Sequence, residues 1–323
     1  MTDSNAAQGG IPLLREIESK QLHRMLSTTG LRLDVGAVSI RVQSDSSIFA
    51  RQLQAVYANF PAIDHAPWAD LHVRIHESTG VRRWLKPQAL FFCDGLQAFD
   101  PFPAASPLPL FEWGCNWLIG RRLNDRLLLH AGAVERDGLA LILPAMPGSG
   151  KSTLTAALSQ HGWRLLSDEF GAYDPLAGHF QAVLKPIALK NESIAVIRRF
   201  ARGAAIGQEF PGTRKGTVAH LAPTADAVKR THLVASPGAI VLPRWEAGAP
   251  TQLIPLPEST VFPALAFNAF NYSLLGADGF RSVVKLVRQC LAWQLVYSEL
   301  EEALGALDAI WARVMEQQLA RPE

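Results

Sequence analysis

The segment AMPGSGKST, residues 145–153, constrains this chain more than any other feature of its sequence. It follows an apolar run at 139–143 and precedes a stretch rich in alanine and leucine at 152–160. Glycine adopts backbone conformations that are closed to other residues, so a Gly-rich turn can aim successive N–H groups at one centre. The sequence therefore predicts a strand, a phosphate-binding loop and a helix, in that order.

The loop nearly matches the pattern G-x-x-x-x-G-K-[ST], with Ala145 in place of the first glycine. Lys151 is expected to reach the β- and γ-phosphates of a nucleoside triphosphate, and the Ser152 hydroxyl to ligate Mg²⁺. An accidental glycine turn is the alternative, but the flanking strand and helix disfavour it. We expect ATP with Mg²⁺ to bind at the residues Ala145, Met146, Pro147, Gly148, Ser149, Gly150, Lys151, Ser152 and Thr153.

Two acidic residues, Asp168 and Glu169, stand near the end of the apolar stretch WRLLSDEF at 163–170. Asp168 follows Lys151 by 168 − 151 = 17 residues, which leaves room for one short helix and a turn. A carboxylate at such a strand end can hold Mg²⁺ or accept a proton from an attacking hydroxyl. Both are therefore candidate catalytic residues, and Asp168 is also a candidate metal ligand. The alternative is an ordinary solvated strand end.

His130 lies in a second apolar run, LLLHAGAV at 127–134, just upstream of the loop. A lone histidine on such a strand is more often a core residue than a catalyst. We retain it as a third catalytic candidate beside the acidic pair, because it precedes the loop so closely.

The composition restricts the class of protein. The chain has 323 residues, 48% of them hydrophobic, and a net charge of 31 − 29 = +2. This balance is typical of a folded domain and shows no basic footprint for nucleic acid or for a membrane surface. No apolar stretch is long enough to span a bilayer, and the N-terminus lacks a secretory signal pattern. We therefore expect a cytoplasmic protein.

The pattern along the chain indicates an α/β fold that carries α+β elements. Residues 1–110 are expected to form a mixed α/β N-terminal lobe, and residues 111–323 a nucleotide-binding core with C-terminal helices. The region 198–230 is rich in Pro, Gly and basic residues, and the chain from about Phe280 onward is expected to be helical.

The stretch from Leu127 to Glu169 resembles the catalytic core of HPr kinase/phosphorylase, and most closely the HPr-kinase-related proteins called HprK-related kinase A. In that core a histidine, a phosphate loop of the form G-D-S-G-x-G-K-S and an Asp-Asp pair follow in this order. His130, the loop through Ser152, and Asp168–Glu169 lie at matching separations. Further stretches similar to the related kinases are KPIALKNESI from Lys185, GTRKGTVAHLAP from Gly212, VLPRW from Val241 and FNAFNYSLLG from Phe267.

The resemblance implies a fold like the C-terminal domain of HPr kinase and of PEP carboxykinase, with a P-loop. It implies transfer of the ATP γ-phosphate to a serine hydroxyl of a protein or peptide, with Glu169 as general base. Asp168 would support Mg²⁺ or orient the nucleophile, and His130 would contact the γ-phosphate or its attacker. A homo-oligomer would also be in keeping with the family.

Two departures from the family pattern matter. Glu169 replaces the second aspartate of the pair, so its carboxylate reaches one methylene further. The family also carries an L-E-x-R-G signature, and the corresponding segment here is LKNES, with Lys190 at the place of the acid. This lysine, like Arg214 and Lys215, could neutralise phosphate charge instead, although for the last two an ordinary surface role is the alternative. A small-molecule P-loop kinase and a regulatory nucleotide-binding module remain alternative functions.

Overall fold

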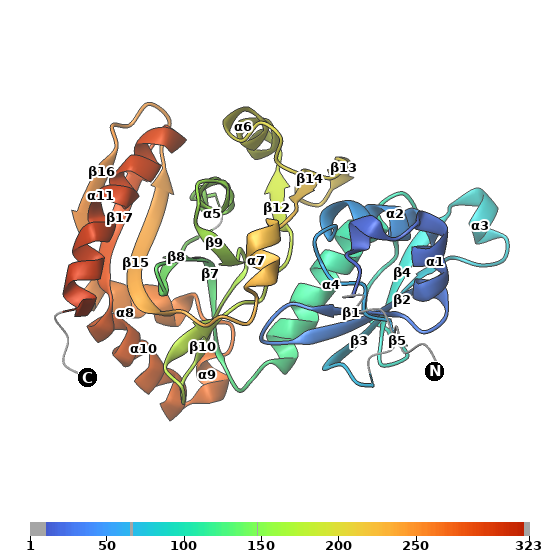
Figure 1. Ribbon diagram of the computed structural model, residues 1–323, viewed down its shortest axis with the longest axis horizontal. Helices are drawn as coiled ribbons and strands as arrows, with labels where there is room; N and C mark the ends of the chain where they lie inside the picture. Colours follow the sequence, from blue (N-terminus) through green and yellow to red (C-terminus); the bar gives the residue numbers. More distant parts are fainter. Residues whose placement is uncertain (1–10, 65–66, 147, 320–323) are drawn as a thin grey trace, which may run out of the picture. The chain divides into compact units, whose positions relative to one another are not determined.

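The computed structural model describes residues 11–64, 67–146 and 148–319 (Figure 1). The chain is mixed α/β, as the sequence predicts, and it divides into two compact units. Unit 1 contains Met1–Asp34 and Ser39–Gly114, and unit 2 contains Val35–Val38 and Cys115–Glu323. The boundary at Gly114 falls inside a helix, α4 (Pro107–Arg122).

Unit 1 is built on a mixed sheet in which one face of each longer strand is buried. In β3, for example, Leu71, Val73 and Ile75 alternate with exposed residues, the pattern of a half-buried strand. The strand order is β1-β2-β3-β4-β5, with β6 paired to β4. The bounds are β1 Leu31–Asp34, β2 Ser39–Ser44, β3 Leu71–Glu77, β4 Gln88–Cys93, β5 Leu96–Gln97, β6 Phe102–Pro103, η1 Leu14–Glu16, α1 Ser19–Ser27, α2 Ser47–Val56 and α3 Arg82–Leu85.

Unit 2 contains an eight-stranded mixed sheet in the described part of the chain, with the path β11-β10-β7-β8-β15-β17-β16 and β9 paired to β7. Strands β8, β15 and β17 run parallel, and β7 pairs antiparallel with β8. The bounds are β7 Leu127–Arg136, β8 Leu139–Pro144, β9 Arg164–Ser167, β10 Phe170–Asp174, β11 His179–Gln181, β15 Ser236–Trp245, β16 Gln252–Pro255 and β17 Leu291–Tyr297.

Strand β7 has β8 on one side and both β9 and β10 on the other. Ala133 pairs with Ser167 of β9, and His130 pairs with Phe170 of β10, so these two strands follow one another along the same edge of β7. Asp168 and Glu169 form the interruption between them. Because β8 and β9 are both antiparallel to β7, they run in the same direction and end at the same edge of the sheet. The loop after β8 and the acidic pair after β9 are therefore neighbours.

Helix α5 (Lys151–Gln160) packs directly on the strands around the loop, namely β7, β8 and β9. Gly132 of β7 allows this close approach, since a Cβ at that position would lie 2.1 Å from Oγ1 of Thr155. In Figure 1, α5 lies above these strands and α8–α10 lie below them. The bounds are α8 Glu258–Phe267, α9 Tyr272–Leu275, α10 Ala277–Gln289 and α11 Leu300–Leu319.

A three-stranded sheet in the order β12-β14-β13 lies beside α5, with β12 and α6 both in contact with that helix. The region 198–230, rich in Pro, Gly and basic residues, contains β13, β14 and α7. In a sequence, the alternating pattern of a short strand is hard to distinguish from that of a loop when Pro and Gly are frequent. The bounds are β12 Ile187–Lys190, β13 Phe210–Thr213, β14 Gly216–Leu221, α6 Glu192–Phe200 and α7 Ala225–Lys229.

The prediction of continuous helix from about Phe280 is wrong in one segment. The structure has α10 and α11 there, but β17 lies between them and pairs in parallel with β15. Trp293, Leu295 and Tyr297 are buried and alternate with less buried residues, which is a strand pattern. Seven residues are too few for this period to stand out between two helices.

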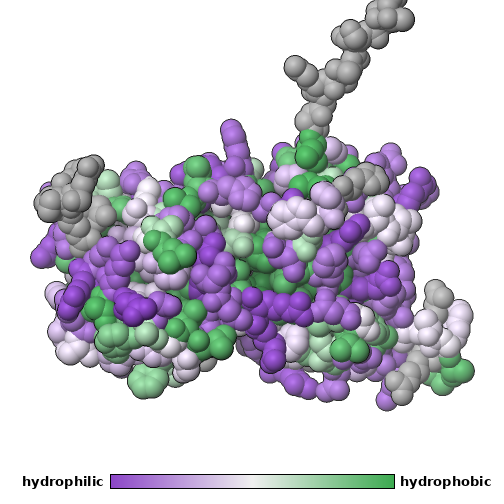
Figure 2. All heavy atoms as spheres, turned by 90° about the horizontal axis from the view of Figure 1, so that it is seen from below, coloured by the Kyte–Doolittle hydropathy of each residue, from purple (hydrophilic) through white to green (hydrophobic). Residues whose placement is uncertain are grey.

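The surface is mixed in character. On the face drawn in Figure 2, apolar side chains form small groups among polar ones. Among the described residues, no helix is both long enough and apolar enough to cross a membrane.

Candidate functional site

The loop between β8 and α5 depends on glycine for its shape. Gly148 has φ 88° and Gly150 has φ 86°, values that L side chains rarely adopt. Ala145 is buried directly after β8, whereas Met146 is 72% exposed, and Thr153 is half-buried on α5. Pro147, which is predicted to belong to the loop, lies outside the described residues.

Two neighbouring strand ends hold this loop in place. The backbone N–H of Trp245 donates to the carbonyl of Ser149 (2.9 Å), and the Tyr297 hydroxyl donates to the carbonyl of Gly150 (3.2 Å). Burial raises the pKa of Tyr297, which keeps the phenol neutral and able to donate. Neither residue can be predicted from the sequence as part of the site, since both meet the loop only through the pairing of β15 with β17.

Lys151 is buried and contacts Asp168 in two ways. Its Nζ donates a hydrogen bond to the backbone carbonyl of Asp168 and lies 3.7 Å from Oδ1 of the same residue. Burial raises the pKa of Asp168, and the positive charge of Lys151 opposes that rise. The Ser152 hydroxyl also hydrogen-bonds this carboxyl group and lowers its pKa. The structure thus brings the three predicted residues together.

His130 and Glu169 form a second pair beside the first. Nε2 of His130 lies 3.7 Å from Oε1 of Glu169, and both side chains are about one-third exposed. Burial lowers the pKa of His130, with Lys151 adding to this effect and Glu169 opposing it. A neutral imidazole and a carboxylate that solvent can reach are groups able to accept or relay a proton.

The segment 268–271 fixes the surroundings of His130. The backbone N–H of His130 donates to the carbonyl of Asn268, and that of Phe270 donates to the carbonyl of Leu128 (2.9 Å). The Phe270 ring lies 5.4 Å from the His130 ring and 5.1 Å from that of Phe170, between centroids. Phe270 therefore covers part of the imidazole, although it is itself half exposed.

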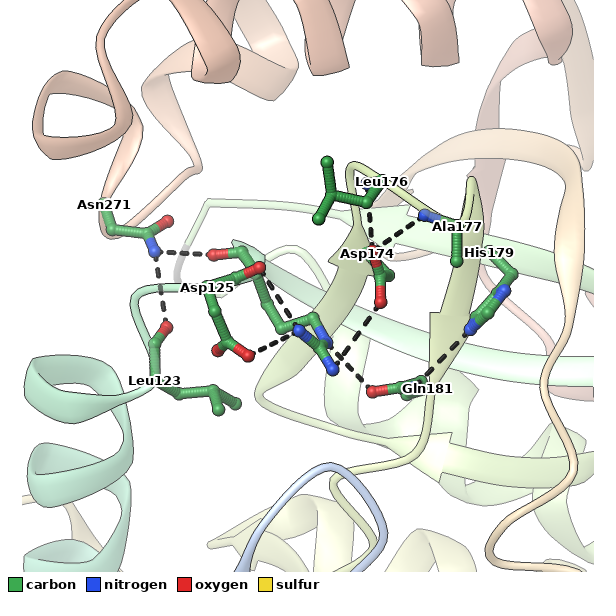
Figure 3. Close-up of polar contacts among 9 residues, drawn as sticks. Leu123, Asp125, Asp174, Leu176, Ala177, His179, Gln181 and Asn271 are labelled. Atoms are coloured by element: carbon green, nitrogen blue, oxygen red, sulfur yellow. Dashed lines mark hydrogen bonds and ion pairs between the residues drawn. The ribbon is translucent and has the colours of Figure 1, made fainter.

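The end of this segment is anchored at the beginning of β7 (Figure 3). The Asn271 amide donates to the carbonyl of Arg126 (2.7 Å) and accepts from the N–H of Leu128 (3.0 Å). The guanidinium of Arg126 in turn hydrogen-bonds Gln181 (2.9 Å) and lies 3.6 Å from Asp174. This network attaches the 268–271 segment to β10 and β11, and so stabilises the position of Phe270 beside His130.

Two lysines outside the loop also interact electrostatically with His130, one of them with Asp168 and Glu169 as well. Lys190 is the last residue of β12, and Lys215 lies in the turn between β13 and β14. Burial lowers the pKa of Lys190, and Lys215 lowers it further, while Asp168 and Glu169 oppose this. Both lysines also lower the pKa of His130. Arg214, like Lys215, is exposed.

The protein side chains at this site could supply only some of the ligands of a magnesium ion, and phosphate and water would have to supply the others. In the described ranges, no three His, Cys, Asp or Glu side chains lie together in a way that could hold a metal ion. Oδ1 of Asp168 is nevertheless buried and accepts no hydrogen bond from any described residue. Carboxylate and hydroxyl oxygens are ligands that Mg²⁺ prefers, and it usually keeps several waters. Asp168 and Ser152 could therefore supply a partial site.

Comparison with known proteins adds no assignment. No family model matches this chain, and no curated protein matches it.

Proposed function

We propose that this chain is an ATP-dependent kinase that transfers the γ-phosphate to a serine hydroxyl of a protein or peptide. The observation that carries the proposal is the proximity of two pairs, Lys151 with Asp168 and His130 with Glu169. A phosphate-binding lysine, a buried acid and an accessible base are the parts that phosphoryl transfer to a hydroxyl needs.

In the proposed reaction, the loop N–H groups and Lys151 bind the β- and γ-phosphates. Glu169 accepts the proton of the acceptor hydroxyl as its oxygen bonds to the γ-phosphorus. The bond from that phosphorus to the β–γ bridging oxygen breaks, and ADP leaves with the electron pair. His130 orients Glu169 or the transferring phosphate. Asp168 and Ser152 would hold the Mg²⁺ of the nucleotide, which neutralises phosphate charge.

We also propose that unit 2 is a P-loop core of the HPr kinase and PEP carboxykinase type. The position of β7 supports this, because an antiparallel strand separates the strand before the loop from the strand before the acidic pair. An ordinary doubly wound sheet is mostly parallel at this place. The sheet order thus argues against a simple Rossmann-like arrangement.

The test is a search for the acceptor with ATP labelled on the γ-phosphate. The purified full chain is incubated with a cell lysate and, separately, with a metabolite mixture, and labelled products are identified by mass spectrometry. We expect label on a serine-containing protein, and none with the Lys151→Ala variant. Label only on metabolites would favour a small-molecule kinase. ATP binding without any transfer would exclude kinase activity and favour a regulatory nucleotide-binding module.

A further inference from the structure

Strand β8, which leads into the loop before α5, has different neighbours on its two sides. On one side lie β7 and then β9, and Asp168 follows β9 directly. On the other side lie β15 and then β17, which run parallel to β8 and so end at the same edge of the sheet as the loop (Figure 1). Ligands of such sheets bind beyond the carboxyl ends of the strands. A nucleotide that directs its terminal phosphate at Asp168 therefore directs its base toward the ends of β15 and β17.

Trp245, the last residue of β15, lies against this loop. Its backbone N–H donates to the carbonyl of Ser149 (2.9 Å), and a Cβ on Gly150 would lie only 3.0 Å from the Cβ of Trp245. Ser149 and Gly150 directly precede Lys151, the first residue of α5. The side chain of Trp245 therefore starts in contact with the loop, on the side away from Asp168.

The indole ring of Trp245 is held in one orientation. Its Nε1 donates to the carbonyl of Ser298 (3.1 Å), and the Ser298 hydroxyl accepts from the N–H of Gly248 (3.1 Å). The N–H of Glu246 donates to the carbonyl of Tyr297 (2.9 Å). The turn after Trp245 is thus attached to the residues at the end of β17. A ring fixed in this way loses little conformational freedom when a ligand binds to it.

Two aromatic residues pair directly across β15 and β17, and they differ in exposure. Tyr297 is 1% exposed and supports the loop through its hydroxyl, whereas Trp245 is 50% exposed. Both N–H groups of Trp245 are bonded within the protein, so its exposed surface is largely that of the aromatic ring. Nucleobases stack on such rings. Trp245 therefore offers a base-stacking surface at the place toward which the base extends.

We propose that the indole of Trp245 stacks on the base of the nucleotide bound at the loop between β8 and α5. This inference rests on the proposed nucleotide binding at that loop. The loop N–H groups and Lys151 bind phosphates, which ATP and inorganic triphosphate share. Trp245 binds the part that only the nucleotide has. The chain therefore binds Mg-ATP more tightly than the magnesium complex of inorganic triphosphate.

The experiment compares the Kd values of the full chain for these two ligands by isothermal titration calorimetry. Trp245→Ala should weaken ATP binding by about tenfold or more, since the stacking of one base on an aromatic ring contributes that much. It should leave triphosphate binding within about twofold, because the bond to Ser149 comes from the backbone. Trp245→Phe keeps a ring without the indole N–H, so it should retain most of the ATP affinity.

The control is Trp84→Ala, which removes an 83% exposed indole from α3 of unit 1 and should change neither Kd. Thermal unfolding checks the fold of each variant. An equal loss for both ligands in Trp245→Ala, or an equal loss of ATP affinity in Trp245→Ala and Trp245→Phe, overturns base stacking. Wild-type binding of triphosphate as tight as that of ATP overturns it too, but leaves phosphate binding intact. If the wild-type chain binds neither ligand, the proposed function fails as well.

Discussion

Nζ of Lys151 lies 3.7 Å from Oδ1 of Asp168 and donates a hydrogen bond to the backbone carbonyl of the same residue. Both side chains are 9% exposed, so the contact takes place away from bulk water. It joins the first residue of α5 to the interruption between β9 and β10. The loop between β8 and α5 and the acidic pair are therefore in direct contact.

Replacing Lys151 should separate nucleotide binding from folding. Lys151→Met keeps the length of the side chain but removes its charge, leaving Asp168 buried without its cation. We expect ATP affinity to fall by at least about tenfold and the free energy of unfolding to fall by about 1–3 kcal/mol. Calorimetry and urea denaturation measure the two effects. Wild-type ATP affinity in this variant would contradict the assignment of Lys151.

Replacing Glu169 should affect the chemical step and spare ligand binding. Glu169→Gln cannot accept a proton, so we expect the rate of transfer to fall by about 10²–10⁴-fold with ATP affinity nearly unchanged. The control is Glu316→Gln, which removes an exposed carboxylate from α11. Single-turnover transfer to the identified acceptor is the measurement. Equal rates in Glu169→Gln and wild type would exclude Glu169 as the base.

The two loop glycines should differ in their tolerance of a methyl group. Both have positive φ, but a Cβ on Gly150 would lie 2.4 Å from the Tyr297 hydroxyl, whereas nothing lies within 4 Å of one on Gly148. Gly148→Ala should cost about 1 kcal/mol of backbone strain, and Gly150→Ala about 1–3 kcal/mol more through the clash. Equal stabilities of the two variants in urea denaturation would contradict this geometry.

Acid should destabilise the folded chain partly through His130. Burial, followed by the charge of Lys151, lowers the pKa of His130 below its ordinary value of 6.5. The unfolded chain therefore binds a proton at this histidine more readily than the folded chain does. The stability contributed by the neutral form of His130 is complete above pH 6.5, and it is lost as pH falls through the pKa of His130 in the folded chain.

We therefore expect His130→Gln to lose less free energy of unfolding than wild type between about pH 8 and about pH 5. The control is His72→Gln, because His72 is exposed in unit 1. Denaturation curves at several pH values give the comparison. A His130→Gln curve parallel to that of wild type would show that the imidazole titrates as it does in the unfolded chain.

Sequence pattern predicted the elements around the loop well, because their signals are local. The apolar runs at 127–134 and 139–143 form β7 and β8, and the stretch at 152–160 lies within α5. Glycines at 148 and 150 have the positive φ that a phosphate-binding loop requires. The binding of ATP there stays a prediction, as do the catalytic roles of His130 and Glu169.

The partners of each strand could not be predicted in the same way. Strand β17 was expected as helix, and its pairing with β15 brings Tyr297 to the carbonyl of Gly150. Nothing near Tyr297 in the sequence signals this contact, since strand pairing depends on residues far away in the chain. Phe270 beside His130 is a similar case, although its segment was noted for its resemblance to the related kinases.

The sequence by itself determined the strand, loop and helix at 139–160 and the acidic pair that follows them. Those features depend on glycine conformation, apolar periodicity and residue spacing, all of which act over a few residues. Only the tertiary structure decided that β9 and β10 share one edge of β7, which places Glu169 beside His130. It also decided that Lys190 and Lys215 act on the same charges, because electrostatic interactions follow distance in space and not separation along the chain.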